Sequence, residues 1–171
     1  KFDGDCKCGT PHVTEEEIKE LFIKAMNILL TEKEDLIADF ETIKDTVFDT
    51  SALLQERAGL QAEMNVVAEQ IEKCIAENAS VAQNQDDYQK RYDSLAKRFD
   101  RTKARLEEVE QMIAEKQAHK EMVEQFLSEL AKQDAITEFT DELWYSMIDC
   151  VTVYTKDDIR FTFKNGTEIK M

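Results

Sequence analysis

Proline and glycine are scarce in this chain, with one Pro and four Gly among 171 residues. A sequence with so few turn-forming residues is not expected to build a fold made mainly of short strands and loops. No stretch approaches the run of about 18 apolar residues that a transmembrane helix needs, so no membrane association is expected. Charged residues instead make up 35% of the composition, which is typical of long helices and coiled coils.

Positive charge is also in short supply. The chain has 22 Lys and Arg against 37 Asp and Glu, which gives a formal charge of −15. A surface this acidic repels the phosphate backbone, so nonspecific nucleic-acid binding by this chain alone is not expected. One short run is basic, and we interpret it as a solvated helix face. It contains Lys97, Arg98, Arg101, Lys103 and Arg105.

Histidine is limited to His12 and His119, and no P-loop or G-x-G-x-x-G motif is present. A Ser-His-Asp triad is therefore not expected, and the many carboxylates are interpreted as solvated helix faces rather than catalytic pairs. The sequence predicts no catalytic residue and no bound small-molecule cofactor within this chain. We do not expect this chain alone to be an enzyme.

The four cysteines are irregularly spaced, which does not indicate a disulfide framework and favours reduced thiols in the cytosol. Cys6 and Cys8 form a C-x-C motif beside a Gly-Thr-Pro turn and near His12. A structural zinc site needs about four ligands, so these residues make at most half a site, and the alternative is a pair of exposed thiols. Cys74 and Cys150 are predicted to be core or half-buried residues.

Residues 14–50 are predicted to form the helices of a base. The sequence Thr14-Glu15-Glu16-Glu17 matches a capping box, and Thr31 begins a second such pattern. A second helix can start there, or the first can run on. Residues 49–51 are the predicted break. The apolar face is predicted at Ile18, Leu21, Phe22, Ala25, Ile28, Leu29, Leu36, Phe40, Ile43 and Val47.

Two heptad seams follow, and they predict an antiparallel coiled-coil arm over residues 51–134 with its tip near 78–88. The first seam has Arg57 at the position between Leu53 and Leu60. It continues through Met64, Val67, Ile71 and Cys74. The second seam begins after a helix cap at Asn84. It contains Tyr88, Tyr92, Leu95, Phe99, Thr102, Leu106, Val109 and Ile113, weakens at Lys116 and Lys120, and recovers at Val123, Leu127 and Leu130.

Residues 135–171 have a different sequence pattern from the heptads before them. Thr140 is predicted to cap a short helix, and two period-2 runs separated by residues 155–158 predict a β-hairpin. Asn165-Gly166 favours a type I′ turn, after which a third strand can begin at Thr167. The predicted fold is mainly α, with a long antiparallel coiled-coil arm on a helical base and a small C-terminal β-hairpin.

Three segments carry a resemblance to a known family. They are CGTPHVTEEEIKELFIKAMNIL (residues 8–29), IEKCIAENASVAQNQDDYQKRYDSLAKRF (71–99) and ELWYSMIDCVTVYTKDDIRFTFKNGTEIK (142–170). In order and spacing they resemble the C-terminal region of large serine recombinases, the group that includes phage serine integrases. The resemblance implies that residues 1–13 are the tail of a truncated zinc ribbon, with Cys8 as its last zinc ligand and Cys6 a weaker match. The chain starts with Lys, and we expect it to be a fragment of a larger protein.

The same resemblance implies a function. The parent protein would be a site-specific recombinase that cleaves and rejoins DNA at two attachment sites, with its catalytic serine, the first zinc ligands and most DNA contacts in domains outside this chain. Zinc would belong to the parent protein, and none is expected on this fragment. The chain would supply the arm, which mediates contacts between recombinase subunits and so controls synapsis and the directionality of integration and excision. A recombination directionality factor is a further expected partner, and the expected location is the cytoplasm, on DNA.

The residues at the predicted tip are compatible with this function. Val81, Tyr88 and Tyr92 offer a few apolar anchors within a polar rim, although both tyrosines also fit the seam. Two other interpretations remain open. A coiled-coil adaptor unrelated to DNA explains residues 50–134 equally well, but not the two ends. A metalloenzyme fragment is disfavoured by the shortage of histidine.

Overall fold

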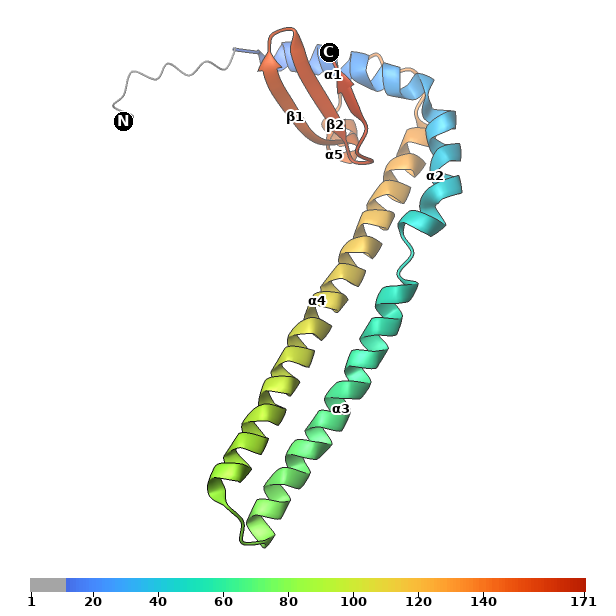
Figure 1. Ribbon diagram of the computed structural model, residues 1–171. Helices are drawn as coiled ribbons and strands as arrows, with labels where there is room; N and C mark the ends of the chain where they lie inside the picture. Colours follow the sequence, from blue (N-terminus) through green and yellow to red (C-terminus); the bar gives the residue numbers. More distant parts are fainter. Residues whose placement is uncertain (1–11) are drawn as a thin grey trace, which may run out of the picture. The chain divides into compact units, whose positions relative to one another are not determined.

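The computed structural model describes residues 12–171, which form five helices and a three-stranded antiparallel sheet (Figure 1). The elements are α1 (Glu15–Thr31), α2 (Lys33–Val47), α3 (Ser51–Ser80), α4 (Gln85–Lys132), α5 (Asp141–Met147), β1 (Ile148–Thr155), β2 (Asp158–Phe163) and β3 (Glu168–Lys170). The predicted fold class is therefore confirmed. Cys6 and Cys8 lie outside the described residues.

The described residues divide into two compact units. Residues 12–45 and 119–171 form one unit, called the base here, and residues 46–118 form the other, called the arm. Helix α4 contributes to both units. Its last part, residues 119–132, falls within the predicted arm bounds of 51–134, but the excess length of this helix over α3 is also expected to pack on the base. This last part belongs to the base unit, where the ring of Phe126 packs 6.3 Å from that of Phe163 in β2.

Helix α1 begins as the sequence predicts. The amide of Thr14 donates to the Glu17 carboxylate over 2.7 Å, and the amide of Glu17 donates to the Thr14 hydroxyl over 3.2 Å, which completes a capping box. The helix buries Phe22, Ala25, Met26 and Leu29. The prediction for Ile28 is wrong, since this side chain is 43% exposed. At roughly 100° per residue, it points well away from the face that Phe22 and Leu29 share.

The second helix starts anew at Lys33. The Thr31 hydroxyl donates to the carbonyl of Ile28 instead of capping α2. Phe40 is buried in α2, but the predicted apolar stripe does not continue, because Ile43 and Val47 are 50% and 49% exposed. Apolar periodicity marks a face of a helix without specifying that anything covers it.

Helix α3 begins after a short break at residues 48–50, as predicted. The carboxylate of Asp49 accepts a hydrogen bond from the amide of Ser51 over 2.8 Å. Thr50, which occupies the N-cap position, makes no side-chain capping bond. Of the three predicted N-cap candidates at residues 49–51, Asp49 therefore supplies the hydrogen-bond acceptor for the first amide of the helix, although it precedes the N-cap residue.

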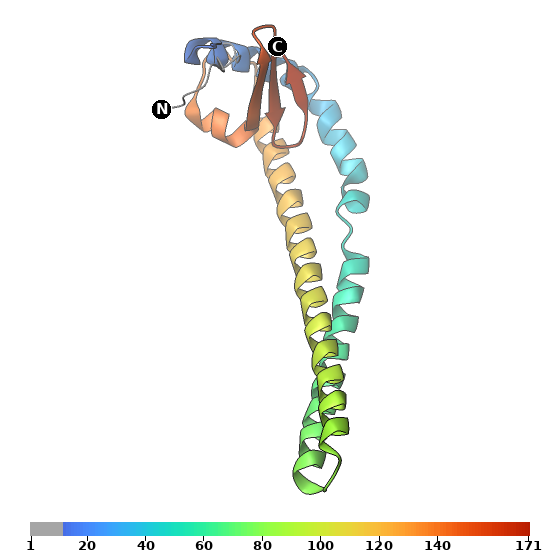
Figure 2. The ribbon, with the colours of Figure 1, turned by 60° about the vertical axis from the view of Figure 1, so that its left-hand side comes forward.

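The sheet has the order β1-β2-β3, with β2 in the centre (Figure 2). Its alternating residues Ile159, Phe161 and Phe163 are buried, as the period-2 pattern predicts. The ring of Phe22 lies 5.5 Å from Phe139, 5.2 Å from Trp144 and 6.4 Å from Phe161. This aromatic cluster joins α1, α5 and β2 into one core.

The turn between β2 and β3 differs from the predicted type I′ turn, which requires positive φ at two residues. Gly166 has a φ of 86°, whereas Asn165 has negative φ. The amide of Gly166 donates to Phe163 and the amide of Phe163 donates to Thr167. This pattern is that of a three-residue loop in which only the glycine adopts the left-handed conformation.

In the arm, α3 and α4 run antiparallel and side by side (Figures 1 and 2). Val67 and Cys74 of α3 are buried, as are Thr102, Leu106, Val109 and Ile113 of α4. One seam prediction is wrong. Arg57 is exposed, and the half-buried residue between Leu53 and Leu60 is Glu56, whose carboxylate accepts a hydrogen bond from Arg105. Between two apolar residues seven apart, such as Leu53 and Leu60, the intermediate seam position of a heptad can lie either three or four residues after the first. The apolar residues alone therefore do not distinguish Glu56 from Arg57.

Gly59 provides a direct test of α3. It lies in the middle of the helix, and a Cβ at this position would meet no atom within 4 Å. Replacing Gly59 with alanine is expected to stabilise the arm by about 0.5–1 kcal/mol, because alanine loses less backbone entropy on entering a helix. Urea denaturation followed by circular dichroism measures this change. An unchanged or lowered midpoint would show that this position is occluded or not helical.

Candidate functional site at the tip of the arm

The tip of the arm is a four-residue turn, residues 81–84, between the end of α3 at Ser80 and the start of α4 at Gln85. The amide of Val81 donates to the carbonyl of Glu77 and ends α3. The Asn84 side chain accepts from the amides of Asp86 and Asp87, over 2.9 and 3.4 Å, and so caps α4 as predicted.

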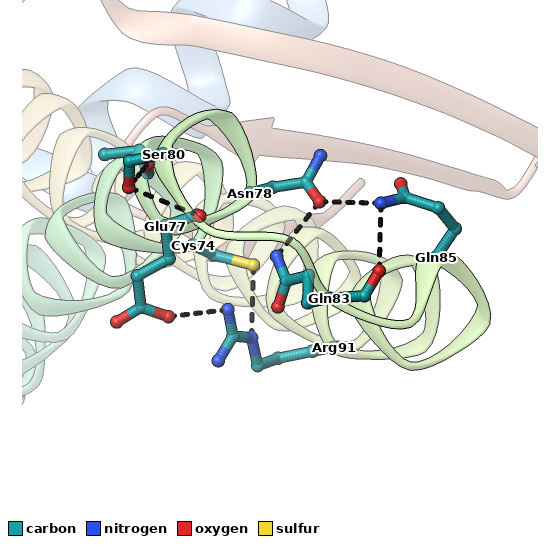
Figure 3. A network of polar contacts seen from close by, with 8 residues as sticks. Cys74, Glu77, Asn78, Ser80, Gln83, Gln85 and Arg91 are labelled. Carbon is teal, nitrogen blue, oxygen red and sulfur yellow. Dashed lines mark hydrogen bonds and ion pairs between the residues drawn. The ribbon is translucent and has the colours of Figure 1, made fainter.

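Asn78 holds the two sides of the turn together (Figure 3). Its side-chain oxygen accepts from the amide nitrogens of Gln83 over 3.0 Å and Gln85 over 3.2 Å. Gln85 also approaches the carbonyl of Gln83 over 3.4 Å. A single acceptor on α3 therefore joins the turn and the first residue of α4, which limits the conformations of the tip.

Arg91 ties the helices together two turns below the tip, and Figure 3 shows its guanidinium directed at α3. Its Nε lies 3.2 Å from the sulfur of Cys74, and Nη2 lies 2.8 Å from the carboxylate of Glu77. Hydrogen bonds to the Cys74 sulfur and to Glu77 raise the pKa of the Arg91 guanidinium. Arg91 is thus charged at any physiological pH and braces the tip.

The three predicted anchor residues differ in their surroundings. Val81 is 63% exposed at the end of α3. Tyr88 and Tyr92 are half-buried, and their rings lie 6.1 Å apart at 34°. Val81 offers most of its side chain to a partner, whereas the half-buried tyrosines offer only part of theirs.

Residues 78–85, NASVAQNQ, contain no charge in a chain in which 35% of residues are charged. Acids begin immediately on either side, at Glu77 and Asp86. The tip thus presents amides, a hydroxyl and one valine. Two such surfaces can approach closely with less electrostatic repulsion than two surfaces rich in acidic side chains would experience.

Three arginine–glutamate pairs cross between the helices of the arm, and the sequence reasoning missed them. The atom separations are 2.8 Å for Arg91 and Glu77, 2.8 Å for Arg98 and Glu63, and 2.7 Å for Arg105 and Glu56. The arginines recur every seven residues. This spacing beside a seam was the available signal, since charges flanking an apolar seam are placed to pair across it.

The other predicted site residues are not at the tip. Cys6 and Cys8 lie outside the described residues, so the zinc prediction has no geometry here. His12 is exposed and lines a groove with Leu21, Lys156 and Ile159. Cys150 is exposed on β1, which contradicts the prediction of a core or half-buried position, because it faces away from the side of the sheet that carries Phe161. Within residues 12–171, no group of three or more His, Cys, Asp or Glu side chains is placed to hold a metal ion.

Comparisons with known protein families, with curated proteins and with solved structures find no match. Among the described helices, none is long and apolar enough to cross a membrane.

Proposed function

We propose that this chain is the coiled-coil region of a site-specific DNA recombinase of the large serine type, and that its tip mediates contacts between recombinase subunits. In this proposal the chain is not itself the catalyst. The parent protein cleaves and rejoins DNA in the cytoplasm through domains outside this chain. Any zinc ion is held by ligands from those domains together with Cys8 and Cys6. The arm controls which pairs of attachment sites come together for integration or excision.

The observation that supports this proposal best is the uncharged tip, with an exposed valine, at the end of a braced helical hairpin. An arm in which Asn78 and Arg91 fix the turn presents Val81 in a defined orientation. The ordering of the contact surface is then largely complete before a partner arrives, which reduces the entropy cost of association.

A contact of this size is weak by itself, since one valine and the free sides of two tyrosines bury far less area than a stable protein–protein interface. Two recombinase dimers already bound to DNA sites raise the effective concentration of their tips, so a weak contact is sufficient to hold them together. A weak contact is also easily switched by a directionality factor that changes which tips can meet.

The test is a gel-shift experiment with the full-length recombinase that carries this chain. Replacing Val81 with aspartate is expected to leave binding to one attachment site unchanged. It should reduce the paired-site complex by about tenfold or more, because each tip then carries a charge that must be desolvated at the contact. The matched control is Val66→Asp, since Val66 is also exposed, at 48%, but lies in the middle of α3.

Paired complexes that form equally well with Val81→Asp would contradict a role for the tip in synapsis. If replacing residues 51–134 with a short linker also leaves paired complexes intact, the interpretation as an adaptor unrelated to synapsis becomes the better one. Loss of pairing with both Val81→Asp and Val66→Asp would show that charge anywhere on the arm interferes, which also argues against a specific tip contact.

A further inference from the structure

The outward face of α3, on the side opposite the seam with α4, carries no charge over its first five turns. Residues 51–68 contain only three charged residues, whereas residues 97–114 of α4, a stretch of equal length, contain nine. Of the three, Glu56 and Glu63 bond to arginines of α4 and so lie on the seam side. Arg57 is exposed but lies about 120° around the helix from the middle of the outward face.

The outward face consists instead of apolar, small and amide side chains, all of them exposed. Leu54 and Val66 are its two large apolar residues, at 38% and 48% exposed. Single exposed apolar residues are common, but depletion of charge around them over about 24 Å of helix is typical of a surface that another protein covers. The face comprises Ser51, Leu54, Gln55, Ala58, Gly59, Gln61, Ala62, Asn65 and Val66.

This face is also complementary to itself. Positions equally far before and after residue 60 carry residues of the same kind. When two identical helices pack antiparallel around a two-fold axis at residue 60, each position meets its counterpart on the other copy. Apolar side chains then meet apolar ones at both ends, and small side chains at the centre let the two helices approach closely. The matched positions are Leu54 with Val66, Gln55 with Asn65, and Ala58 with Ala62.

Charge favours the antiparallel over the parallel arrangement. The next residue on this side of α3 is Glu69, at the end of the uncharged stretch. A parallel pair would set Glu69 of one copy against Glu69 of the other, whereas an antiparallel pair sets it against Ser51. The dipoles of two helices are also opposed, and so attract, only when the helices run antiparallel.

We propose that the outward face of α3 packs against the same face of a second copy of this chain, antiparallel and around a two-fold axis at residue 60. We call this arrangement the lateral pair. A contact along about 24 Å of one helix buries less than the roughly 1,200 Å² of a stable interface, so the lateral pair is weak and needs a high local concentration. It does not depend on the proposed role in recombination.

The lateral pair is distinct from a contact between tips. Val81 lies 21 residues beyond residue 60, and in opposite directions on the two copies. The two tips are then about 60 Å apart at 1.5 Å per residue, so the same two chains cannot form both contacts at once. Val66→Asp should therefore weaken the lateral pair without affecting the paired-site complex, and Val81→Asp should do the reverse.

The test is sedimentation equilibrium of the full 171-residue chain under reducing conditions, which prevent a disulfide through the exposed Cys150. The average mass is expected to rise from that of a monomer toward that of a dimer over about a hundredfold increase in concentration. Ala62→Glu should raise the dissociation constant by about tenfold or more, because each copy then has to bury a carboxylate against Ala58.

Ala76→Glu is the matched control. Ala76 is exposed and lies on the same side of α3 as Ala58, five turns further along and among charged residues. This variant should associate as the unmodified chain does. Glutamate is a good helix former, and circular dichroism of both variants checks that their helix content is unchanged.

A double variant tests the direction of packing. Gln55→Lys combined with Asn65→Glu leaves the net charge unchanged. In the antiparallel pair the new ammonium group of each copy faces the new carboxylate of the other, so association should become tighter. In a parallel pair each new charge would face its own like, and association would become weaker.

Four results would overturn the proposal. They are a mass that stays monomeric throughout, equal weakening by Ala62→Glu and Ala76→Glu, weaker association of the double variant, and dissociation by Val81→Asp. The last result would place the contact at the tip and so support the proposed function while contradicting the lateral pair. A gel shift in which Val81→Asp has no effect would do the opposite, since it contradicts the tip contact alone.

Discussion

Replacing Phe161 with alanine is expected to lower the free energy of unfolding of the base by about 3–5 kcal/mol, the usual cost of emptying a buried aromatic site. Phe161 is fully buried on the central strand β2. It is paired to Val151 on one side and Ile169 on the other. Its ring lies 6.4 Å from both Phe22 and Trp144, so the cavity would open between α1, α5 and the sheet.

The chain has one tryptophan, which makes this prediction specific to the base. Trp144 belongs to the same aromatic cluster, so its fluorescence reports unfolding of the base, whereas circular dichroism at 222 nm is dominated by the long helices α3 and α4. The Phe161→Ala variant should unfold at lower urea by tryptophan fluorescence. Tyr145→Ala is the control, since Tyr145 is 73% exposed on the neighbouring helix and should cost little.

An unchanged fluorescence midpoint for Phe161→Ala would show that β2 does not form the centre of this core. A loss equal to that of Tyr145→Ala would lead to the same conclusion. Coincident shifts in fluorescence and circular dichroism would show that the base and the arm unfold as one cooperative unit.

The elements that the sequence predicts well are those defined by local rules. The capping box at Thr14, the cap at Asn84 and the alternation along β2 each depend on residues within a few positions of one another. The aromatic cluster could not be predicted in the same way. Phe22, Phe139, Trp144 and Phe161 come from three separate parts of the chain, and only the tertiary structure brings α1, the segment around α5 and β2 together.

The candidate site likewise has one feature that the sequence predicts and one that only the structure shows. The polar stretch that contains Val81 identifies the tip from the sequence, because uncharged turn residues interrupt two heptad seams. The role of Asn78 could not be predicted, since Gln83, Asn84 and Gln85 are also amides and nothing in the sequence says which one accepts from the others.

The heptad pattern that predicts the arm does not by itself fix the register of α3 against α4. An apolar seam that repeats every seven residues tolerates a slip of one heptad, because each apolar residue then meets another apolar residue. The charged pairs do not fix the register either. Arg98 and Arg105 meet Glu63 and Glu56 at matching steps of seven residues, whereas Gln70 stands at the step that corresponds to Arg91, which instead meets Glu77; a slip of one heptad would likewise leave one arginine, Arg98, opposite Gln70.

Reversing the three arginines should destabilise the arm, because each of them pairs with a glutamate of α3. In the variant with Arg91, Arg98 and Arg105 all changed to Glu, each attractive pair becomes a pair of like charges. An exposed pair contributes little by itself and like charges cost a similar amount, so the three positions together should clearly lower the urea midpoint at low salt. Urea denaturation followed at 222 nm measures the loss, and about 1 M NaCl should reduce it, since salt screens charges over a few ångströms.

The variant that also changes Glu56, Glu63 and Glu77 to Arg should regain most of the lost stability, because the three pairs between the helices are restored with their signs exchanged and only the Arg105–Glu108 pair within α4 is not. The control for net charge changes Arg57, Lys73 and Lys97 to Glu. These three exposed cations have no ion-pair partner among the described residues, and their reversal alters the charge of the chain by the same amount. Equal destabilisation by this control would show that net charge, and not the pairing of specific residues, determines the stability of the arm. Failure of the sixfold variant to recover would mean that these three pairs do not stabilise the packing of α3 against α4.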